Sequence, residues 1–177
     1  VQQFVGDAEQ NDDQTMLGIQ YTKKQDTNIR LSRSITLSND IEEVPQLAVF
    51  VDETCEAIGF DMSLTASLNL AMEEAVVNVM NYAYPSSTKG QIVVEAQANE
   101  QFVKFVITDW GVPFDPTTKE DADTTLSAEE RPIGGLGVYL VRQIMDSINY
   151  ERTDGKNVLT LIKKLVDTEE AAANPSL

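Results

Sequence analysis

Alternating apolar and polar positions mark five segments of strand character along the chain. These segments are residues 29–37, 90–98, 101–109, 149–152 and 157–164. Asn99-Glu100 joins the second segment to the third, and Asp154-Gly155 joins the fourth to the fifth, so each pair is expected to form an antiparallel hairpin. The first segment carries the weakest signal, because Arg33 interrupts its apolar face.

Apolar residues at helical spacing predict three helices. The first covers residues 41–58, and the second runs from about residue 63 to 83 and stops at Pro85. The third covers about residues 138–148. Residues 115–131, ahead of it, are acidic and threonine-rich, which predicts a long mobile loop. Helices combined with hairpins favour an α+β fold, a two-layer sandwich with about three helices on one face of a mixed, mostly antiparallel sheet.

Composition excludes several classes of function. The chain has 177 residues and no histidine, which excludes histidine acid–base catalysis, histidine metal ligation and histidine phosphorelay within it. Its formal net charge of −16 argues against nucleic acid and anionic membranes as partners, because both attract basic patches. No apolar run approaches the ~18 residues of a membrane span. The single cysteine, Cys55, cannot form an internal disulfide, so a reducing cytoplasm is the expected location of the protein. Cys55 lies in an apolar pattern of helical spacing, so we expect its side chain to be buried in the core.

A polar stripe runs along the second predicted helix, which is apolar over most of its circumference. Glu74, Asn78 and Asn81 lie at positions i, i+4 and i+7 and therefore share one face. Burying these groups without partners would cost several kcal/mol, so they either meet internal polar partners or line a site. A carboxylate beside an amide oxygen suits Mg²⁺, which also binds waters and phosphate oxygens. Taken alone, the stripe fits a structural role equally well.

Two further motifs contain residues suited to a nucleotide. Asp109 ends the third strand just before Gly111, where a carboxylate can accept the amine of a purine, although Asp-Trp-Gly alone more often forms only a turn. Gly134, Gly135 and Gly137 directly precede the third helix, whose amide groups and dipole favour a phosphate. This glycine cluster is neither a P-loop nor a complete dinucleotide fingerprint.

In this order and spacing, the three motifs resemble the N, G1 and G2 boxes of the Bergerat-fold (GHKL) ATPases. Their sequences are "EEAVVNVMNYAYP", "DWGVPFDP" and "RPIGGLGVYLVRQIMD", and "GKNVLTLIKKL" looks like the closing strand of the family. The closer resemblance is to the anti-sigma-factor serine kinases of bacterial partner-switching systems, and it covers about residues 28–166. It implies binding of ATP with Mg²⁺, phosphorylation of an anti-sigma-factor antagonist on serine, and binding of a sigma factor in an alternative complex.

The resemblance also implies roles for individual residues. Glu74 corresponds to the general base, Asn78 to the Mg²⁺ ligand and Asp109 to the adenine anchor. Residues 115–131 correspond to the lid over ATP, and Arg131 is a candidate contact to the γ-phosphate. The other implied nucleotide contacts are Asn81, Tyr82, Gly111, Pro113, Gly134, Gly135, Leu136, Gly137, Val138 and Thr160. Tyr82 departs from the family, which often has a histidine at this position.

The first residues of the chain resemble a different family. Residues 4–21, "FVGDAEQNDDQTMLGIQY", look like the last motif and final strand of the PP2C-type serine/threonine phosphatases that regulate bacterial sigma factors. By this resemblance Asp12 is the remnant of a metal site, and residues 1–25 are the inactive stub of a phosphatase domain plus a linker. The alternative is a random acidic tail. We expect residues 15–21 to pack against the ATPase domain or to pair with a second copy as a homodimer, and residues 167–177 to form a flexible acidic tail.

Three functions are compatible with these observations. The preferred one is an ATP-dependent protein serine kinase, which the carboxylate of Glu74 favours. The second is a nucleotide sensor that changes partners without transferring phosphate. The third is the ATPase domain of a histidine-kinase-like protein, but the absence of histidine excludes autophosphorylation within this chain.

Overall fold

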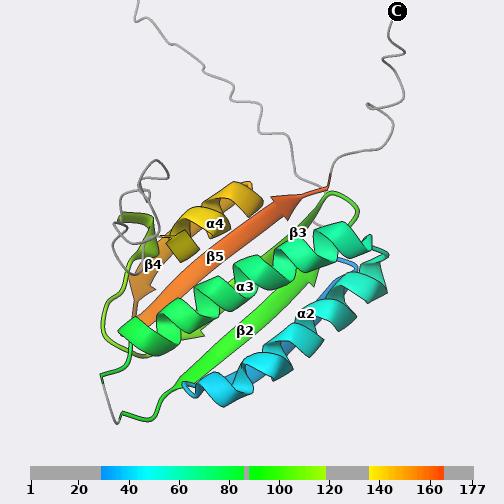
Figure 1. Ribbon diagram of the computed structural model, residues 1–177. Coiled ribbons are helices and arrows are strands. Elements are labelled where there is room, and N and C mark those ends of the chain that lie inside the picture. The colour runs from blue at the N-terminus through cyan, green and yellow to red at the C-terminus, as the bar shows by residue number, and fades with distance from the viewer. Residues whose placement is uncertain (1–28, 86–87, 119–135, 166–177) are drawn as a thin grey trace, which may run out of the picture.

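The computed structural model describes residues 29–85, 88–118 and 136–165, and the strands of this part form one sheet (Figure 1). The strands are β1 (Leu31–Ser38), β2 (Gln91–Ala98), β3 (Phe102–Asp109), β4 (Ser147–Thr153) and β5 (Lys156–Lys164). Their order is β1-β2-β3-β5-β4, and every neighbouring pair is antiparallel. The predicted α+β fold is confirmed, although the described strands form a purely antiparallel sheet and not a mixed one.

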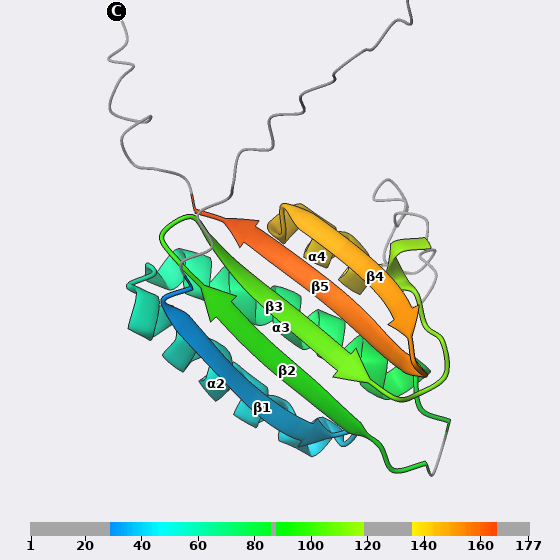
Figure 2. The ribbon, with the colours of Figure 1, turned by 180° about the vertical axis from the view of Figure 1, so that it is seen from behind.

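The three α-helices of the described residues cover one face of the sheet (Figure 1). They are α2 (Val44–Ile58), α3 (Met62–Tyr82) and α4 (Leu136–Ile144), and α3 packs against both of the others. Two single-turn 3-10 helices, η1 (Ile41–Glu43) and η2 (Pro116–Thr118), complete the described elements. No described helix lies on the opposite face, which Figure 2 shows from behind. None of the described helices is long and apolar enough to span a membrane.

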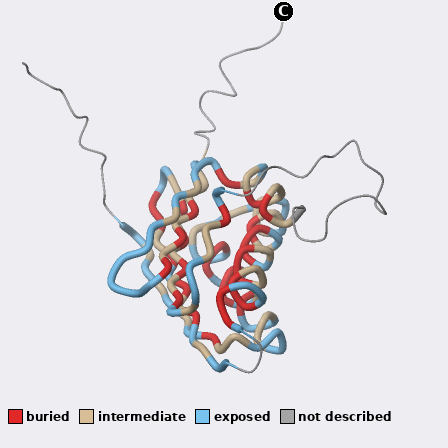
Figure 3. Tube along the Cα trace, turned by 90° about the vertical axis from the view of Figure 1, so that its left-hand side faces the viewer, coloured by how far each residue is buried: buried red, intermediate tan, exposed pale blue. Residues whose placement is uncertain are grey.

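The hydrophobic core fills the space between the helices and the sheet (Figure 3). Alternate residues of the central strands and one side of α3 are fully buried there. The largest of them are Leu68, Met72, Val76, Ile92, Val94, Val103, Phe105, Ile107 and Leu161. Burying a side chain of this size stabilises the fold by roughly 1.5–3 kcal/mol relative to leaving it exposed. The apolar positions whose spacing predicts these strands and helices are therefore the positions that are buried in the structure.

Most helix boundaries follow local signals. The side chain of Asp61 caps α3, because its Oδ1 accepts hydrogen bonds from the backbone N–H groups of Ser63 (2.8 Å) and Leu64 (2.9 Å). Helix α2 ends at Gly59, whose φ of 75° suits a residue without a Cβ. The first predicted helix, residues 41–58, is in fact the turn η1 followed by α2.

The predicted bounds of the third helix are wrong at its C-terminal end. Helix α4 stops at Ile144, and Ser147 already begins β4. The backbone N–H of Asp146 donates to the carbonyl of Ile162 (2.9 Å), and its side chain accepts from the N–H of Lys164 (2.6 Å). These contacts tie the chain to β5, so the helix ends because of residues far away in the sequence.

Arg33, which interrupts the apolar face of β1, finds its partner on a helix. Its Nη2 lies 2.9 Å from Oε2 of Glu53 in α2. Both side chains are partly exposed, and ion pairs of this kind contribute at most about 1 kcal/mol. The strand thus keeps its alternation although one inward position is charged.

Candidate functional site

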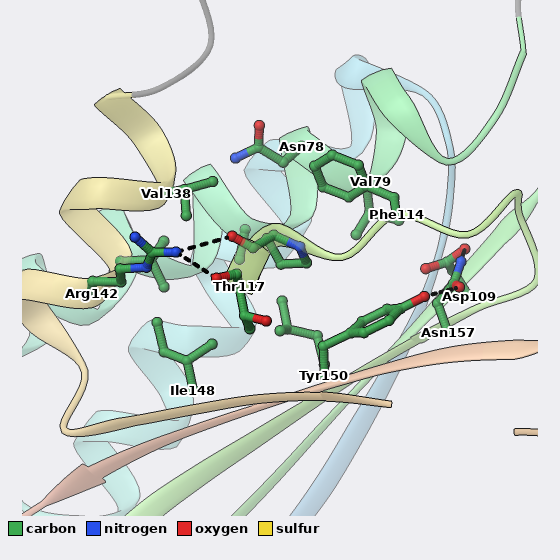
Figure 4. Close-up of a pocket in the computed structure, with 14 residues that line it drawn as sticks. Asn78, Val79, Asp109, Phe114, Thr117, Val138, Arg142, Ile148, Tyr150 and Asn157 are labelled. Carbon is green, nitrogen blue, oxygen red and sulfur yellow. Dashed lines mark hydrogen bonds between the residues drawn. The ribbon is translucent and has the colours of Figure 1, made fainter. Parts of the chain in front are cut away.

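A pocket lies where the end of β3 and the start of β5 meet α3 and α4 (Figure 4). Its lining is mostly apolar, with Asn78, Asp109 and Asn157 among the polar residues. The cavity holds about 20 Å³, about enough for one water molecule. A ligand the size of a purine ring therefore enters only if the neighbouring side chains shift.

Asp109 occupies the end of β3 and is 2% exposed. Its Oδ1 accepts hydrogen bonds from Nδ2 of Asn157 and from the N–H of Gly111, both at 2.8 Å. Its Oδ2 makes no hydrogen bond within the described residues, where every fully buried side-chain polar atom has a partner. Oδ2 is therefore not fully buried, and in a residue that lines the pocket it is able to accept one more donor.

Burial raises the pKa of the Asp109 carboxyl above its ordinary value. The hydrogen bonds from Asn157 and Gly111 and the charge of Arg152 oppose this rise, because they stabilise the ionised form. The site thus keeps an acceptor in an environment that disfavours charge.

The sequence motifs did not indicate Asn157, although the resemblance implied a nucleotide contact from Thr160 in the same strand. Strand alternation turns Asn157 and Leu159 towards the helices, where both line the pocket, and turns Thr160 to the helix-free face. Thr160 does not line the pocket. The available signal was an amide that shares one face of a strand with Leu159 and Leu161.

The polar stripe on α3 is only partly directed at the pocket. Asn78 lines it, and its Nδ2 donates to the backbone carbonyl of Glu74 at 2.7 Å, which leaves Oδ1 for another partner. Glu74 is half-buried one turn away, and its carboxylate makes no hydrogen bond with a described residue. Asn81 is exposed and does not line the pocket.

Gly137 allows α4 to approach this part of α3 closely. A Cβ at Gly137 would lie 2.2 Å from Oε2 of Glu74 and 3.3 Å from Nδ2 of Asn78. The next residue, Val138, lines the pocket, while only the backbone of Leu136 is described, as the first residue of α4. The start of α4 thus adjoins Glu74 and Asn78 of α3, the residues expected to serve as general base and Mg²⁺ ligand.

The loop after β3 is held against the end of α3. A Cβ at Gly111 would lie 2.2 Å from the carbonyl oxygen of Ala83, and the N–H of Val112 donates to that oxygen at 2.7 Å. Gly111 is thus needed for the close approach of two backbones. Pro113 is exposed and does not line the pocket.

Three residues near the pocket mouth add contacts that the motifs did not indicate. Phe114 lines the pocket and stacks on Tyr82, with ring centroids 5.2 Å apart. Arg142 of α4 donates to the backbone carbonyl of Thr117 at 2.8 Å and so ties η2 to that helix. Tyr82 is 41% exposed and does not line the pocket.

Several predicted site residues lie outside the described residues. They are Asp12, Arg131, Gly134 and Gly135, together with most of the predicted lid at residues 115–131. Among the described residues, no group of three or more Asp, Glu and Cys side chains could hold a metal ion. A cation here would rely on Oδ1 of Asn78 and on oxygen atoms of its ligand.

The comparison with known families supports the same assignment. The family model of the histidine kinase-like ATPase domain matches residues 37–163. The chain belongs to this family. The predicted family is thus confirmed, and an ATP-binding domain follows from it.

Individual relatives within this family include protein kinases. Serine-protein kinase RsbW of Listeria monocytogenes is 28% identical over 120 residues, which is 66% of this chain and 75% of that protein. Serine/threonine-protein kinase BtrW of Bordetella bronchiseptica is 31% identical over 98 residues, 55% of this chain and 69% of that protein. Within the ATPase family, the chain is therefore homologous to serine kinases of the RsbW type.

A solved structure shares the fold. The crystal structure of the RsbU and RsbW domains of a Mycobacterium tuberculosis protein matches with a TM-score of 0.53 and 21% identity. The match covers 75% of this chain but only 32% of that chain. It supports the two-layer ATPase fold of this family.

Proposed function

We propose that this chain is an ATP- and Mg²⁺-dependent protein serine kinase. The observation that carries the proposal is the accessible Oδ2 of Asp109 in a pocket that Asn78 also lines, with Glu74 one turn away on α3. The pocket and the adjoining turn of α3 thus combine an acceptor for a nucleotide base with an amide and a carboxylate suited to phosphoryl transfer.

The adenine ring belongs at Asp109. Its Oδ2 would accept the exocyclic amine, while the apolar lining, including Val79, Val138 and Leu159, would cover the ring. A hydrogen bond to a charged acceptor contributes about 1.5–3 kcal/mol. This contribution is large enough to determine which nucleotide binds.

The phosphate groups belong near Asn78, Glu74 and the start of α4. Oδ1 of Asn78 would hold Mg²⁺, because its Nδ2 is already bonded to the carbonyl of Glu74. The cation would neutralise charge on the phosphates, which this acidic chain otherwise repels. Arg131, Gly134 and Gly135 remain predicted contacts of the phosphates.

Glu74 is the proposed general base. It would take the proton from a substrate serine while the serine oxygen attacks the γ-phosphorus. The bond between the γ-phosphorus and the β–γ bridging oxygen of ATP would break, and ADP would leave with that oxygen. The carboxylate suits this role because it is only half-buried and bonds to no described residue.

The protein substrate is proposed to be an anti-sigma-factor antagonist, and a sigma factor is the proposed partner of the alternative complex. Similarity to serine-protein kinase RsbW supports both assignments. The net charge of −16 supports protein partners over nucleic acid or anionic lipid, in a cytoplasmic setting.

The decisive experiment measures phosphate transfer from labelled ATP to candidate antagonist proteins. Glu74→Gln should retain ADP binding but slow single-turnover transfer by roughly two to four orders of magnitude, the usual range for a lost general base. Glu73→Gln is the matched control. Glu73 is next to Glu74 in the sequence, but its carboxylate is exposed and should have no role in transfer.

The outcomes separate the kinase from a sensor. ADP binding by a chain that transfers no phosphate to any antagonist would favour a nucleotide sensor that changes partners without chemistry. Transfer that is equally fast in Glu74→Gln would show that Glu74 has only a structural role.

The N-terminal assignment is a separate proposal. Residues 1–25, with Asp12, are proposed to be a phosphatase stub, the ATPase domain to span residues 28–166, and residues 167–177 to form a tail. One aspartate cannot build a two-metal site, so no phosphatase turnover is expected with any divalent metal. Deletion of residues 1–25 should leave ATP binding intact and weaken any homodimer, which calorimetry and sedimentation would measure.

A further inference from the structure

Asn157 uses every hydrogen-bonding position of its side chain. Nδ2 donates to Oδ1 of Asp109 (2.8 Å) and to the backbone carbonyl of Val112 (3.0 Å). Oδ1 accepts from the hydroxyl of Tyr150 (2.8 Å) and from Nη1 of Arg152 (2.5 Å). An amide has two donor hydrogens and one oxygen with two lone pairs, so this side chain has no capacity left.

These four bonds fix which way the amide points. Rotating it by half a turn would set its NH₂ group against Arg152, which can only donate, and its oxygen against the Asp109 carboxylate, which can only accept when ionised. Asn157 is 3% exposed, so water cannot replace the lost partners. Nδ2 therefore stays on Oδ1 of Asp109.

The same residues hold the backbone around Asp109. Nη1 of Arg152 also donates to the carbonyl of Gly111 (3.2 Å), and the N–H of Gly111 bonds to Oδ1 of Asp109. Asn157, Tyr150 and Arg152, here termed the Asn157 network, thus link the β4–β5 hairpin to the loop after β3. Figure 4 shows Tyr150, Asn157 and Asp109 side by side at one end of the pocket. Both donors to the carboxylate reach the same oxygen, and Oδ2 is left for the pocket.

We infer that Asn157 is a positioning residue that aims Oδ2 of Asp109 at the exocyclic amine of adenine, so that the Asn157 network sets the base selectivity of the site. The inference rests on the proposed nucleotide-binding function. An ionised carboxylate attracts the amine of adenine and repels the carbonyl oxygen that guanine and hypoxanthine carry at the same ring position. Selectivity therefore requires a carboxylate that is both fixed in direction and charged.

The Asn157 network supports the charge as well as the direction. Burial raises the pKa of Asp109, and the hydrogen bond from Asn157 opposes this rise. The other charged or titratable groups around Asp109 in the described residues are Arg152 and Tyr150 of β4, Tyr84 after α3 and Arg142 of α4. Tyr150 and Arg142 line the same pocket. Without Asn157, protonation of Asp109 would begin at a higher pH, and a protonated carboxyl group can donate to a carbonyl oxygen.

The experiment compares binding of ADP and of inosine diphosphate to the full chain, with Mg²⁺, by calorimetry. Inosine diphosphate differs in carrying a carbonyl oxygen in place of the amine. The variants are Asn157→Ala and the milder Tyr150→Phe, which removes one hydrogen bond to Asn157 and none to Asp109. Asn149→Ala is the matched control, because this exposed asparagine of β4 lies outside the pocket lining.

The parent chain should prefer ADP by roughly ten- to a hundredfold, as expected for one charge-assisted hydrogen bond. Asn157→Ala should lose most of this preference, Tyr150→Phe a smaller part and Asn149→Ala none. As the pH falls, ADP affinity should begin to drop at a higher pH in Asn157→Ala than in the parent.

An unchanged preference for ADP in Asn157→Ala would overturn the inference, even if both affinities fell together. If that variant does not fold, an unchanged preference in Tyr150→Phe would overturn it equally. A parent that binds both nucleotides alike would also refute the inference, while leaving phosphate transfer from ATP intact. A parent that binds neither would refute the proposed function itself.

Discussion

The two ends of β3 each bury polar side chains, but the partners come from different parts of the chain. At the start of the strand, Asn99 is 7% exposed, and its Oδ1 accepts from the N–H groups of Gln101 (2.8 Å) and Phe102 (3.1 Å). At its other end, Asp109 is bonded to Asn157, which is 48 positions away along the chain. One end is satisfied by its own turn, and the other depends on the complete fold.

This difference separates a structural polar group from a functional one. Asn99 closes the β2–β3 hairpin, and its carbonyl oxygen is occupied by the turn itself. Asp109 receives donors on one oxygen only, and its other oxygen is not fully buried and belongs to a residue that lines a pocket. Burying a carboxylate in this way costs stability, which is a common feature of sites that bind a ligand.

Gly111→Ala should have the largest effect on the free energy of unfolding. The added Cβ would lie 2.2 Å from the oxygen and 2.7 Å from the carbon of the Ala83 carbonyl, and backbone atoms cannot move aside easily. We expect a loss of about 3 kcal/mol in denaturant unfolding. ADP affinity should fall too, because the loop also carries the N–H that bonds to Asp109.

Gly59→Ala is the matched control for this variant. Gly59 has a φ of 75°, and a Cβ added there would meet no atom within 4 Å, so alanine brings backbone strain of about 1 kcal/mol but no clash. ADP affinity should be unchanged. Equal destabilisation by the two substitutions would contradict the role assigned to the close approach at Gly111.

Asn99→Ala should have an intermediate effect on stability and none on binding. It leaves two backbone N–H groups of the part-buried β2–β3 turn without their acceptor, which costs about 1–2 kcal/mol. Thermal unfolding would measure the loss, with the exposed Asn149→Ala as control. A fall in ADP affinity at neutral pH would show that the two ends of β3 are coupled, contrary to the comparison above.

The difference between nearby and distant partners also decides which features of the fold are predictable from the sequence. Strands and helices were predictable because burial repeats with the period of each element, and caps such as Asp61 act on residues two and three positions away. The end of α4 was not, because Asp146 is bonded to Lys164 across the sheet. Asp109 was identified from its motif, whereas its partner Asn157 depends on strand pairing that no local pattern specifies.

Thr160 shows the same limit in a residue that the motifs implied but that does not line the pocket. It lies in the correct strand, but a strand changes face at every residue, so a shift of three positions exchanges the pocket for the helix-free face. Helical spacing gives the same limited precision for the polar stripe on α3, because Asn78 lines the pocket while Asn81 is exposed. Motif resemblance locates a site to within a few residues, and packing decides which side chains enter it.

Asp109→Asn should have the smallest effect on stability but a clear effect on binding. Oδ1 of the new amide can still accept from Asn157 and Gly111, so the fold keeps its contacts. Its NH₂ group then replaces Oδ2 in the pocket and opposes the amine of adenine, so ADP affinity should fall roughly ten- to a hundredfold. Asp154→Asn, in the exposed β4–β5 turn, removes the same charge and should leave ADP affinity unchanged.

The stability of Asp109→Asn relative to the parent should also depend on pH, in a direction set by the pKa of Asp109. Burial raises that pKa, so the contribution of Asp109 to stability is fully present below its unfolded pKa, about 3.9, and is lost as the pH rises through the higher folded pKa. The amide does not titrate in this range. At pH 7 the variant should therefore unfold at the same temperature as the parent or slightly above it, by no more than about 4 °C. On acidification towards pH 4, the parent should gain stability relative to the variant, as differential scanning calorimetry would measure. A parent that loses stability relative to the variant over this range would mean that the hydrogen bonds from Asn157 and Gly111 outweigh the burial of the carboxylate.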